Sequence, residues 1–357
     1  MSASRVGDLD RKALASAAAA RWAEASQALR RGEPGAADPA LANHFAQVSQ
    51  ISGLSIATTS DGIGTKVELA ERTGVYDTLG FDLMAMVVDD LAAAGATPLS
   101  ITNILDVDTI DPAVVDDLMR GLFEAARAAR VAVSGGEIAE LGPRIGGYGA
   151  GMHFNWCATA IGWFPPGHPP LSGAALQAGD RLIGLPSPGF RSNGLTLARG
   201  LLTERHGEDW HTVDWRGRTW GARLRWPSRI YAPALVDLRA ALGPDLHGAA
   251  HITGGGIPNK LGRVLRATGL GAQISDPLSP PPEMVELGAA LDPITRWRAW
   301  NQGHGMILAL AANAADAALA ALRDQGHAAA VIGEVVSTPG ITIQPAGAPA
   351  IRFEATP

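Results

Sequence analysis

Segments with the spacing of helices alternate with short segments typical of strands along this chain, and this alternation restricts it to folds that pack helices against sheets. Apolar residues that recur every three or four positions predict helices at residues 12–31, 80–96, 112–130, 193–204, 235–242 and 258–268. Runs rich in β-branched and aliphatic residues predict strands at residues 54–59, 99–105, 131–133, 181–185, 306–310 and 341–344. The predicted fold class is therefore α/β or α+β.

A proline-rich segment divides the chain near its middle. Residues 162–173 contain four prolines, which suits a connection between domains better than a helix or a strand. A chain of 357 residues is also long enough for two hydrophobic cores. We expect an N-terminal domain over residues 1–165 and a C-terminal α/β domain over residues 172–357.

Composition excludes several classes of protein. The net charge of −6 and the pI near 5.8 disfavour a nucleic-acid surface, which needs clustered basic residues. The single cysteine, Cys157, excludes an internal disulfide and a cysteine metal site, and its apolar surroundings at residues 153–161 predict a thiol packed in the core. The sequence shows neither a secretory signal nor an apolar run long enough for a membrane helix, so a soluble, cytoplasmic protein is expected.

The segment Asp61-Gly62-Ile63-Gly64-Thr65-Lys66 follows a predicted strand and could bind phosphate. Its glycines allow backbone N–H groups to approach an anion, its lysine supplies a point charge, and its aspartate could hold Mg²⁺. A plain tight turn would have a similar sequence. The segment is not a Walker A loop, because neither Lys66 nor Lys260 follows a glycine.

Acidic residues occur at two further places where burial would be costly. Asp89 and Asp90 lie in an otherwise apolar helix, and Glu137 follows two glycines, Gly135 and Gly136, just after a short predicted strand. A magnesium–nucleotide complex needs oxygen ligands from several segments, so these acids and Asp61 are candidate ligands. The alternatives are an aspartate on the solvated side of the helix and a glutamate in a solvated turn.

Two glycine-containing segments precede predicted helices in the second half. They are residues 189–194, with Arg191, Ser192 and Asn193, and residues 251–256, from His251 through Thr253, Gly254 and Gly255. Free N–H groups at a helix start favour anions, although ordinary helix caps look the same. His247 and His251 have the spacing of zinc ligands on a helix, but the glycines around them disfavour a helix and hence a zinc site.

Taken in order, these segments resemble the aminoimidazole ribonucleotide synthetase family, also called phosphoribosylformylglycinamidine cyclo-ligases. The resemblance extends from about residue 54 to residue 335. It is carried by residues 59–66, 80–86, 90–91, 95–99, 135–140, 192–194, 247–256 and 303–306.

The resemblance implies a two-domain homodimer whose N-terminal domains meet through β-strands, and an enzyme that uses Mg²⁺ and ATP to close an imidazole ring on a small-molecule substrate. In this chain it implies catalytic roles for Lys66, Asp90 and His251 and substrate contacts from Arg191, Ser192, Asn193, Thr253, Gly254 and Gly255. ATP contacts are implied for Asp61, Gly62, Gly64, Thr65, Lys66, Gly135, Gly136 and Glu137, and metal contacts for Asp61, Asp89, Asp90 and Glu137. No general base is assigned.

The chain departs from the family pattern at several positions. It has Asp89 in place of an asparagine, Arg191 in place of a histidine, and Asn103 and Asn155 in place of aspartates, and the family's glycine-rich segment before the first strand has no counterpart in residues 38–52. Two alternatives therefore stay open: a divergent relative that activates another small molecule with ATP, and a binding protein without catalysis. Thiamine-phosphate kinase and selenophosphate synthetase, from the same superfamily, fit the Asp90 helix and the residues 251–256 less well.

Overall fold

The computed structural model describes residues 3–38 and 44–355 and contains two large mixed sheets. The first sheet has the strand order β1-β2-β3-β6-β4-β5, in which only β4 and β5 pair in parallel. Its strands are Ala36–Ala37 (β1), Gln47–Ile51 (β2), Leu54–Gly62 (β3), Thr97–Val107 (β4), Ala132–Glu140 (β5) and Phe154–Trp163 (β6). The predicted fold class is confirmed, with mostly antiparallel pairing.

Two helices, Leu79–Ala93 (α3) and Pro112–Ala129 (α4), account for the helical layer of this half and confirm two predicted helices. α3 is apolar on almost every side and buries most of its residues, because it packs between the first sheet, α4 and the second half. α4 begins at Pro112 after Asp111, whose carboxylate accepts hydrogen bonds from the N–H groups of Ala113 and Val114. A short helix, Val67–Thr73 (α2), follows the 3₁₀ turn Gly64–Lys66.

The second sheet has the order β10-β12-β7-β13-β11-β14-β15, and only β11 and β14 pair in parallel. Its strands are Arg181–Pro186 (β7), Leu246–His251 (β10), Gly271–Ile274 (β11), His304–Leu310 (β12), Ala330–Val336 (β13), Gly340–Ile343 (β14) and Ile351–Phe353 (β15). Its accompanying helices are Leu195–His206 (α5), Trp220–Leu224 (α6), Ala232–Leu242 (α7), Gly256–Leu265 (α8), Pro282–Gly288 (α9), Pro293–Ala299 (α10) and Ala315–Asp324 (α11). A small hairpin joins Asp214–Trp215 (β8) to Arg218–Thr219 (β9).

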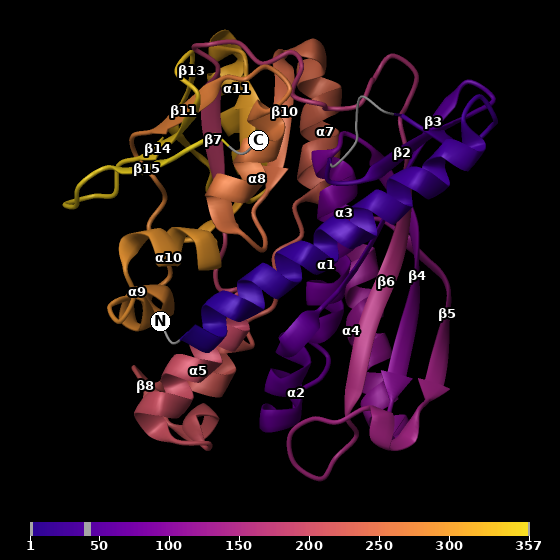
Figure 1. Cartoon of the computed structure of the whole chain (residues 1–357), viewed down its shortest axis with the longest axis vertical. Helices are drawn as coiled ribbons and strands as arrows, with labels where there is room; N and C mark the ends of the chain where they lie inside the picture. Colours follow the sequence, from indigo (N-terminus) through magenta and orange to yellow (C-terminus); the bar gives the residue numbers. More distant parts are fainter. Residues whose placement is uncertain (1–2, 39–43, 356–357) are drawn as a thin grey trace.

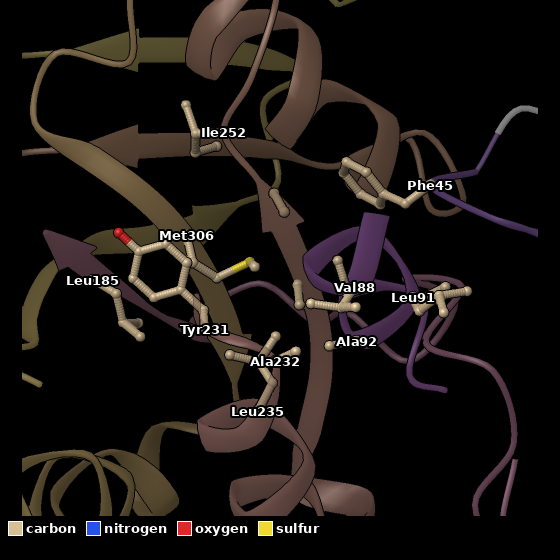
Figure 2. Packing of buried hydrophobic residues seen from close by; sticks show 14 of the residues in the cluster. Phe45, Val88, Leu91, Ala92, Leu185, Tyr231, Ala232, Leu235, Ile252 and Met306 are labelled. Carbon is tan, nitrogen blue, oxygen red and sulfur yellow. The ribbon is translucent and has the colours of Figure 1, made fainter. Parts of the chain in front are cut away.

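One hydrophobic core runs through both halves. In Figure 2, Val88, Leu91 and Ala92 of α3 lie on one side of Ala232 and Leu235 of α7, and Met306 of β12 and Leu185 of β7 lie on the other side. All seven residues belong to one buried cluster. Because α3 contributes to both halves, it holds the functional residues on its surface in a fixed position relative to the second sheet.

The N-terminal helix, Ala3–Gln27 (α1), runs obliquely across the molecule in Figure 1 and includes the helix predicted from residue 12. The side chains of Leu14 and Trp22 are 72% and 67% exposed, so this helix contributes little to the core. None of the helices in the described ranges is both long and apolar enough to cross a membrane.

Two sequence predictions in the first sheet are wrong. The strand predicted to end at Val133 continues through Glu140, so Gly135, Gly136 and Glu137 lie inside β5 and not beyond its end. The predicted core thiol of Cys157 is only partly buried, since β6 alternates and Cys157 is on the sheet face opposite the helices. Burial, together with Asp106, raises the pKa of this thiol.

Candidate functional site

Segments from both halves of the chain meet around the C-terminal part of α3, and we call this region the junction site. It comprises Gly64, Thr65, Asp89, Asp90, Arg191, Ser192, Asn193, His251 and Gly254. Four of the segments that carry the family resemblance, residues 59–66, 90–91, 192–194 and 247–256, therefore converge in space.

The loop after β3 lies against the start of α5. The hydroxyls of Thr65 and Thr196 are 3.3 Å apart, and a Cβ atom placed on Gly64 would lie 3.9 Å from the carbonyl oxygen of Ser192. Gly64 has a φ of +57°, a conformation that favours glycine over other residues. Because Gly64 and Thr65 are both exposed, their backbone groups are open to a ligand.

Asn193 connects the two glycine-containing segments of the second half. A Cβ on Gly254 would lie 3.1 Å from the Asn193 side-chain oxygen, and the Asn193 amide nitrogen is 3.7 Å from the sulfur of Met86 on α3. Thr253 is buried, and Gly255, with a φ of +92°, immediately precedes α8. The hydroxyl of Ser192 is buried without a hydrogen-bond partner among the described residues, which suits a polar ligand group at this point.

Asp90 and His251 form a hydrogen-bonded pair between α3 and the end of β10. The Oδ1 atom of Asp90 is 2.7 Å from Nδ1 of His251, and His251 is fully buried. Burial raises the pKa of Asp90 to about 7, although Lys260, Arg263 and Arg191 oppose this shift. Burial, assisted by Arg191, lowers the pKa of His251 well below its usual value. The pair therefore carries a carboxyl group that can gain or lose a proton near neutral pH.

Asp89 and Arg191 are both buried and form an ion pair at 3.0 Å. The other oxygen of Asp89 accepts hydrogen bonds from the backbone N–H groups of Tyr231 and Ala232, at 2.7 and 2.9 Å. Both carboxylate oxygens of Asp89 are therefore bonded to protein groups, whereas the sequence predicts that Asp89 contacts a metal. Arg191, expected to contact substrate, is only 1% exposed and contacts Asp89 and His251 instead.

Lys66 is also inside the protein. Its ammonium donates to Oδ1 of Asp82 at 2.6 Å and to the carbonyl of Trp226 at 2.7 Å, and both charged side chains are completely buried. The sequence predicts a contact between Lys66 and phosphate. The structure differs, because Gly64 and Thr65 are exposed whereas the Lys66 ammonium is directed into the protein interior. The hydroxyl of Ser228 also donates to Asp82, so the cluster joins α3 to the segment before α7.

The expected acidic ligands are not gathered into one metal site. Residues that pair across neighbouring strands form a row on the first sheet. One row contains Asp61, Ala158, Asn103 and Gly136, and the next row contains Cys157, Ile104 and Glu137. Adjacent positions along a strand face opposite sides, so Asp61 and Glu137 project from opposite faces of the sheet. The ranges described contain no group of three or more His, Cys, Asp or Glu side chains that could hold a metal ion.

The two asparagines that depart from the family pattern, Asn103 and Asn155, differ in their surroundings. The side-chain oxygen of Asn103 accepts from the indole N–H of Trp156 at 3.0 Å, and its amide donates to the carbonyl of Gly135 at 3.3 Å. Asn103 is buried, so these bonds satisfy a polar group that would otherwise be costly. Asn155 is exposed in β6, opposite Asp106 of β4.

The two histidines considered for zinc bind different carboxylates. Nδ1 of His247 is 2.7 Å from Asp180, whereas His251 contacts Asp90. Sequence reasoning missed the buried groups Asp82 and Tyr231. Asp82 gave the same signal as Asp89, a carboxylate in an apolar helix, but its partners come from residues far along the chain.

Family models match both halves of the chain. The N-terminal domain of AIR synthase related proteins matches residues 43–162, and the C-terminal domain of the same proteins matches residues 177–345.

Curated relatives and solved structures agree with this assignment. A phosphoribosylformylglycinamidine cyclo-ligase of Thermococcus kodakarensis is 35% identical over 320 residues, covering 88% of this chain and 89% of the relative. One of Sorangium cellulosum is 37% identical over 286 residues, covering 79% of this chain and 80% of the relative. In fold, the chain is similar to a chain of the HypE–HypF complex (TM-score 0.62, 17% identity, 88% of this chain and 93% of that one). It is also similar to a thiamine-monophosphate kinase from Stenotrophomonas maltophilia (TM-score 0.60, 20% identity, 88% and 92%). The chain therefore belongs to the family of AIR synthase related proteins.

Proposed function

We propose that this protein is an ATP-dependent cyclo-ligase that converts formylglycinamidine ribonucleotide to aminoimidazole ribonucleotide in purine biosynthesis. The observation that carries the proposal is the junction site, where the Asp90–His251 pair links the two halves at 2.7 Å. Relatives at 35% and 37% identity over most of their length are named for this activity, which supports the same reaction here.

The reaction joins a phosphoryl transfer to a ring closure. The amide oxygen of the substrate takes the terminal phosphoryl group of ATP, ADP leaves, and the phosphorylated oxygen becomes a good leaving group. The attacking nitrogen of the same molecule then forms the C–N bond of the imidazole ring and loses a proton, and phosphate leaves with the former amide oxygen. Holding both reacting atoms in one site makes the closure effectively unimolecular.

We assign the substrate to the side of the junction site formed by the second half. Ser192 offers a buried hydroxyl without a partner in the described structure, and the neighbouring Asn193 contacts Gly254 of the loop that also carries Thr253 and Gly255. Asp90 is the candidate catalytic residue, because its pKa of about 7 allows its carboxyl group to exchange a proton at neutral pH. His251 holds this carboxyl group in place.

ATP is proposed to bind the exposed loop of the first half and the neighbouring sheet. This assignment uses the residues Asp61, Gly62, Gly64, Thr65, Gly135 and Gly136. It leaves out Glu137, whose side chain projects from the face of the sheet opposite to that of Asp61. A structural neighbour, hydrogenase maturation protein HypE, was solved in complex with ATP, which is consistent with a nucleotide site on this fold. For Lys66 we propose a structural role in place of a phosphate contact, because its ammonium is bonded to Asp82 and Trp226.

Mg²⁺ is proposed only as the partner of ATP in the MgATP substrate. The acids of one chain do not fit a protein-held Mg²⁺ site, since Asp61 and Glu137 face opposite sides of the sheet and Asp89 is saturated by protein donors. We therefore derive no catalytic step through the metal.

We also propose a cytoplasmic homodimer with the domain division at residues 1–165 and 172–357. The face of the first sheet opposite α3 carries the half-exposed apolar side chains of Ile104 and Ile161, at 48% and 42% exposure. A second copy of the chain would bury these side chains and extend or cover the edge strand β5.

The proposal is tested by phosphate release from MgATP with and without formylglycinamidine ribonucleotide, with the imidazole product identified by mass spectrometry. We expect substrate to stimulate release and one phosphate to form per product. Asp90→Asn should lower kcat by about 10²-fold or more, whereas the exposed His206→Gln serves as a control and should not change it. Release that the substrate does not stimulate, or wild-type turnover in Asp90→Asn, contradicts the proposal.

A further inference from the structure

Four side chains, of which Asp89, Arg191 and His251 are buried and Asp90 is partly buried, form a continuous chain of hydrogen bonds in the junction site. Asp89 Oδ2 is 3.0 Å from Arg191 Nη2, Arg191 Nη2 is 2.8 Å from His251 Nε2, and His251 Nδ1 is 2.7 Å from Asp90 Oδ1. Asp89 and Asp90 are neighbours on α3, whereas Arg191 and His251 come from the loop after β7 and the end of β10. Arg191 therefore lies between one carboxylate and the imidazole that contacts the other.

The direction of these hydrogen bonds determines the state of the imidazole. A guanidinium group has only N–H donors, so the contact at 2.8 Å requires an unprotonated Nε2 that accepts. The single ring proton must then reside on Nδ1, from which it is donated to Asp90. If the His251 ring carried both protons, its Nε2–H would point at an N–H group of Arg191 across the same 2.8 Å. Burial, and after it the charge of Arg191, lowers the pKa of His251, which also favours the ring with a single proton.

Arg191 is held in this position from several sides. Asp89, its counter-charge, is itself fixed by the backbone N–H groups of Tyr231 and Ala232 at the start of α7. Nη1 of Arg191 donates to the carbonyl of Arg229 at 3.2 Å, and its guanidinium lies over the ring of Tyr231 at 5.0 Å. The backbone of Arg191 has a φ of +60°, which a residue other than glycine adopts rarely.

We propose that Arg191 is a positioning residue that, anchored on Asp89, holds His251 as the neutral Nδ1–H tautomer and thereby orients the carboxyl group of Asp90. Asp89 and Arg191 are both departures from the family pattern, where an asparagine and a histidine are expected. The structure shows these two departures in contact, so they constitute one paired exchange: an arginine with no carboxylate beside it would be a buried, uncompensated charge. The inference about catalysis rests on the proposed function, but the tautomer does not.

The variant for the test must remove the charges of Asp89 and Arg191 but keep the hydrogen bonds that Asp89 accepts from the start of α7. Asp89→Asn/Arg191→Met does so, because the asparagine side-chain oxygen can still accept from Tyr231 and Ala232 while the buried charge pair is replaced by neutral groups. The matched control is Arg130→Met/Asp237→Asn, which removes an exposed pair with contacts of 2.8 and 2.9 Å between the residue after α4 and α7.

The primary measurement is ¹⁵N NMR of ring-labelled histidines, with His251 assigned by its absence in His251→Gln. In the wild-type protein and in the control we expect a protonated Nδ1 and an unprotonated Nε2 for His251 from pH 8 to pH 5.5. In Asp89→Asn/Arg191→Met we expect an Nε2–H tautomer to appear, or the ring to become protonated within that range. A wild-type proton on Nε2, or unchanged His251 signals in the double variant, overturns the proposal.

The secondary measurement separates positioning from folding. If Arg191 acts through His251 and Asp90, kcat should fall by about tenfold or more in the double variant with a smaller change in KM. If the double variant has the thermal stability and the kcat of the wild type, the positioning role is contradicted. A wild-type enzyme inactive on formylglycinamidine ribonucleotide would contradict the proposed function alone, because the NMR measurement needs no turnover.

Discussion

At the scale of single residues, a buried ion pair of the first half is bonded to the second half of the chain. Lys66 and Asp82 are completely buried, and the segment before α7 supplies further hydrogen bonds through Trp226 and Ser228. Removing one partner of such a pair leaves an uncompensated charge, which is more costly than removing both. Lys66 therefore contributes to the junction between the halves even without contacting a ligand.

We expect Lys66→Met to lower the free energy of unfolding by about 3–5 kcal/mol, because Asp82 then keeps its charge without an ionic partner. Lys66→Met/Asp82→Leu should lose less than the single variant. The surface variant Arg127→Met, which breaks an exposed pair with Glu124, should change the same quantity by about 1 kcal/mol or less. Urea denaturation measures all three, and a Lys66→Met variant as stable as Arg127→Met would contradict the structural role.

His304 provides a pH-dependent contribution at the same scale. Its Nε2 accepts from the backbone N–H of Leu278 at 3.0 Å, and its Nδ1 lies 2.9 Å from the carbonyl of Gln302, to which the neutral ring donates. Burial lowers the pKa of His304 to about 4. Protonation of Nε2 would break the hydrogen bond from Leu278, so the folded protein requires the neutral ring of His304.

The sign of the pH effect follows from this shift. Between about pH 4 and pH 6.5 the unfolded chain binds the histidine proton and the folded protein does not, so stability should fall as the pH is lowered through this window. In His304→Gln the slope should be smaller by up to about 1.4 kcal/mol per pH unit. Denaturation at several pH values measures the slope. The exposed His206→Gln should leave it at the wild-type value, and equal slopes in the two variants would refute the assignment.

At the scale of elements, the approach of α3 to α4 depends on two glycines. A Cβ on Gly80 would lie 2.3 Å from the carbonyl carbon of Gly121, and a Cβ on Gly121 would lie 1.8 Å from the carbonyl oxygen of Asp77. Neither glycine has a positive φ, so it is the space between the helices that requires them. This close contact holds α3, and with it Asp89 and Asp90, in register with the sheet.

Gly121→Ala tests this contact, because two effects of opposite sign compete. Alanine favours a helix over glycine by about 1 kcal/mol, whereas overpacking against a backbone carbonyl costs about 1–3 kcal/mol. We expect the clash to dominate and the melting temperature to fall. Gly146→Ala, where no atom lies within 4 Å of the added Cβ, should melt as the wild type does. A stabilised Gly121→Ala variant would show that the helices can separate without cost.

The same elements show how far the sequence could predict the fold. α3 and α4 were predicted because their apolar residues recur with helical spacing over several turns, and Asp111 and Pro112 indicate the start of α4. β5 was predicted too short, since Ser134, Gly135 and Gly136 are typical of a turn, and pairing with β4 overrides that preference.

The candidate site was predictable in its segments but not in its contacts. The glycines and acids of residues 61–66, 89–90 and 251–256 were identified from local patterns, and the structure brings most of these segments together. The partners of Lys66 and Arg191 could not be predicted, because Asp82, Trp226 and Asp89 become their neighbours only through tertiary packing. Local sequence contains no information on which of several buried cations pairs with which carboxylate.

At the scale of the whole molecule, the two sheets differ in how much apolar surface they leave exposed. β12 of the second sheet is buried along its whole length, whereas the first sheet exposes Ile104 and Ile161 on the face opposite the helices. Cys157 and Thr159 belong to the same face, and β5 leaves one edge of the sheet unpaired among the residues that the structure describes. Such a surface is typical of an interface between subunits.

The homodimer proposed for this face is tested by Ile104→Asp. A charged side chain in the centre of the buried face would remain unpaired between two copies, so the dimer should dissociate to monomers while each chain stays folded. Sedimentation velocity at micromolar concentration measures the mass, and circular dichroism checks the fold. Val285→Asp replaces an apolar residue of α9 that is 55% exposed, away from the first sheet, and should leave the dimer intact. A wild-type monomer, or a dimeric Ile104→Asp variant, would mean that the uncovered face of the first sheet is not the interface.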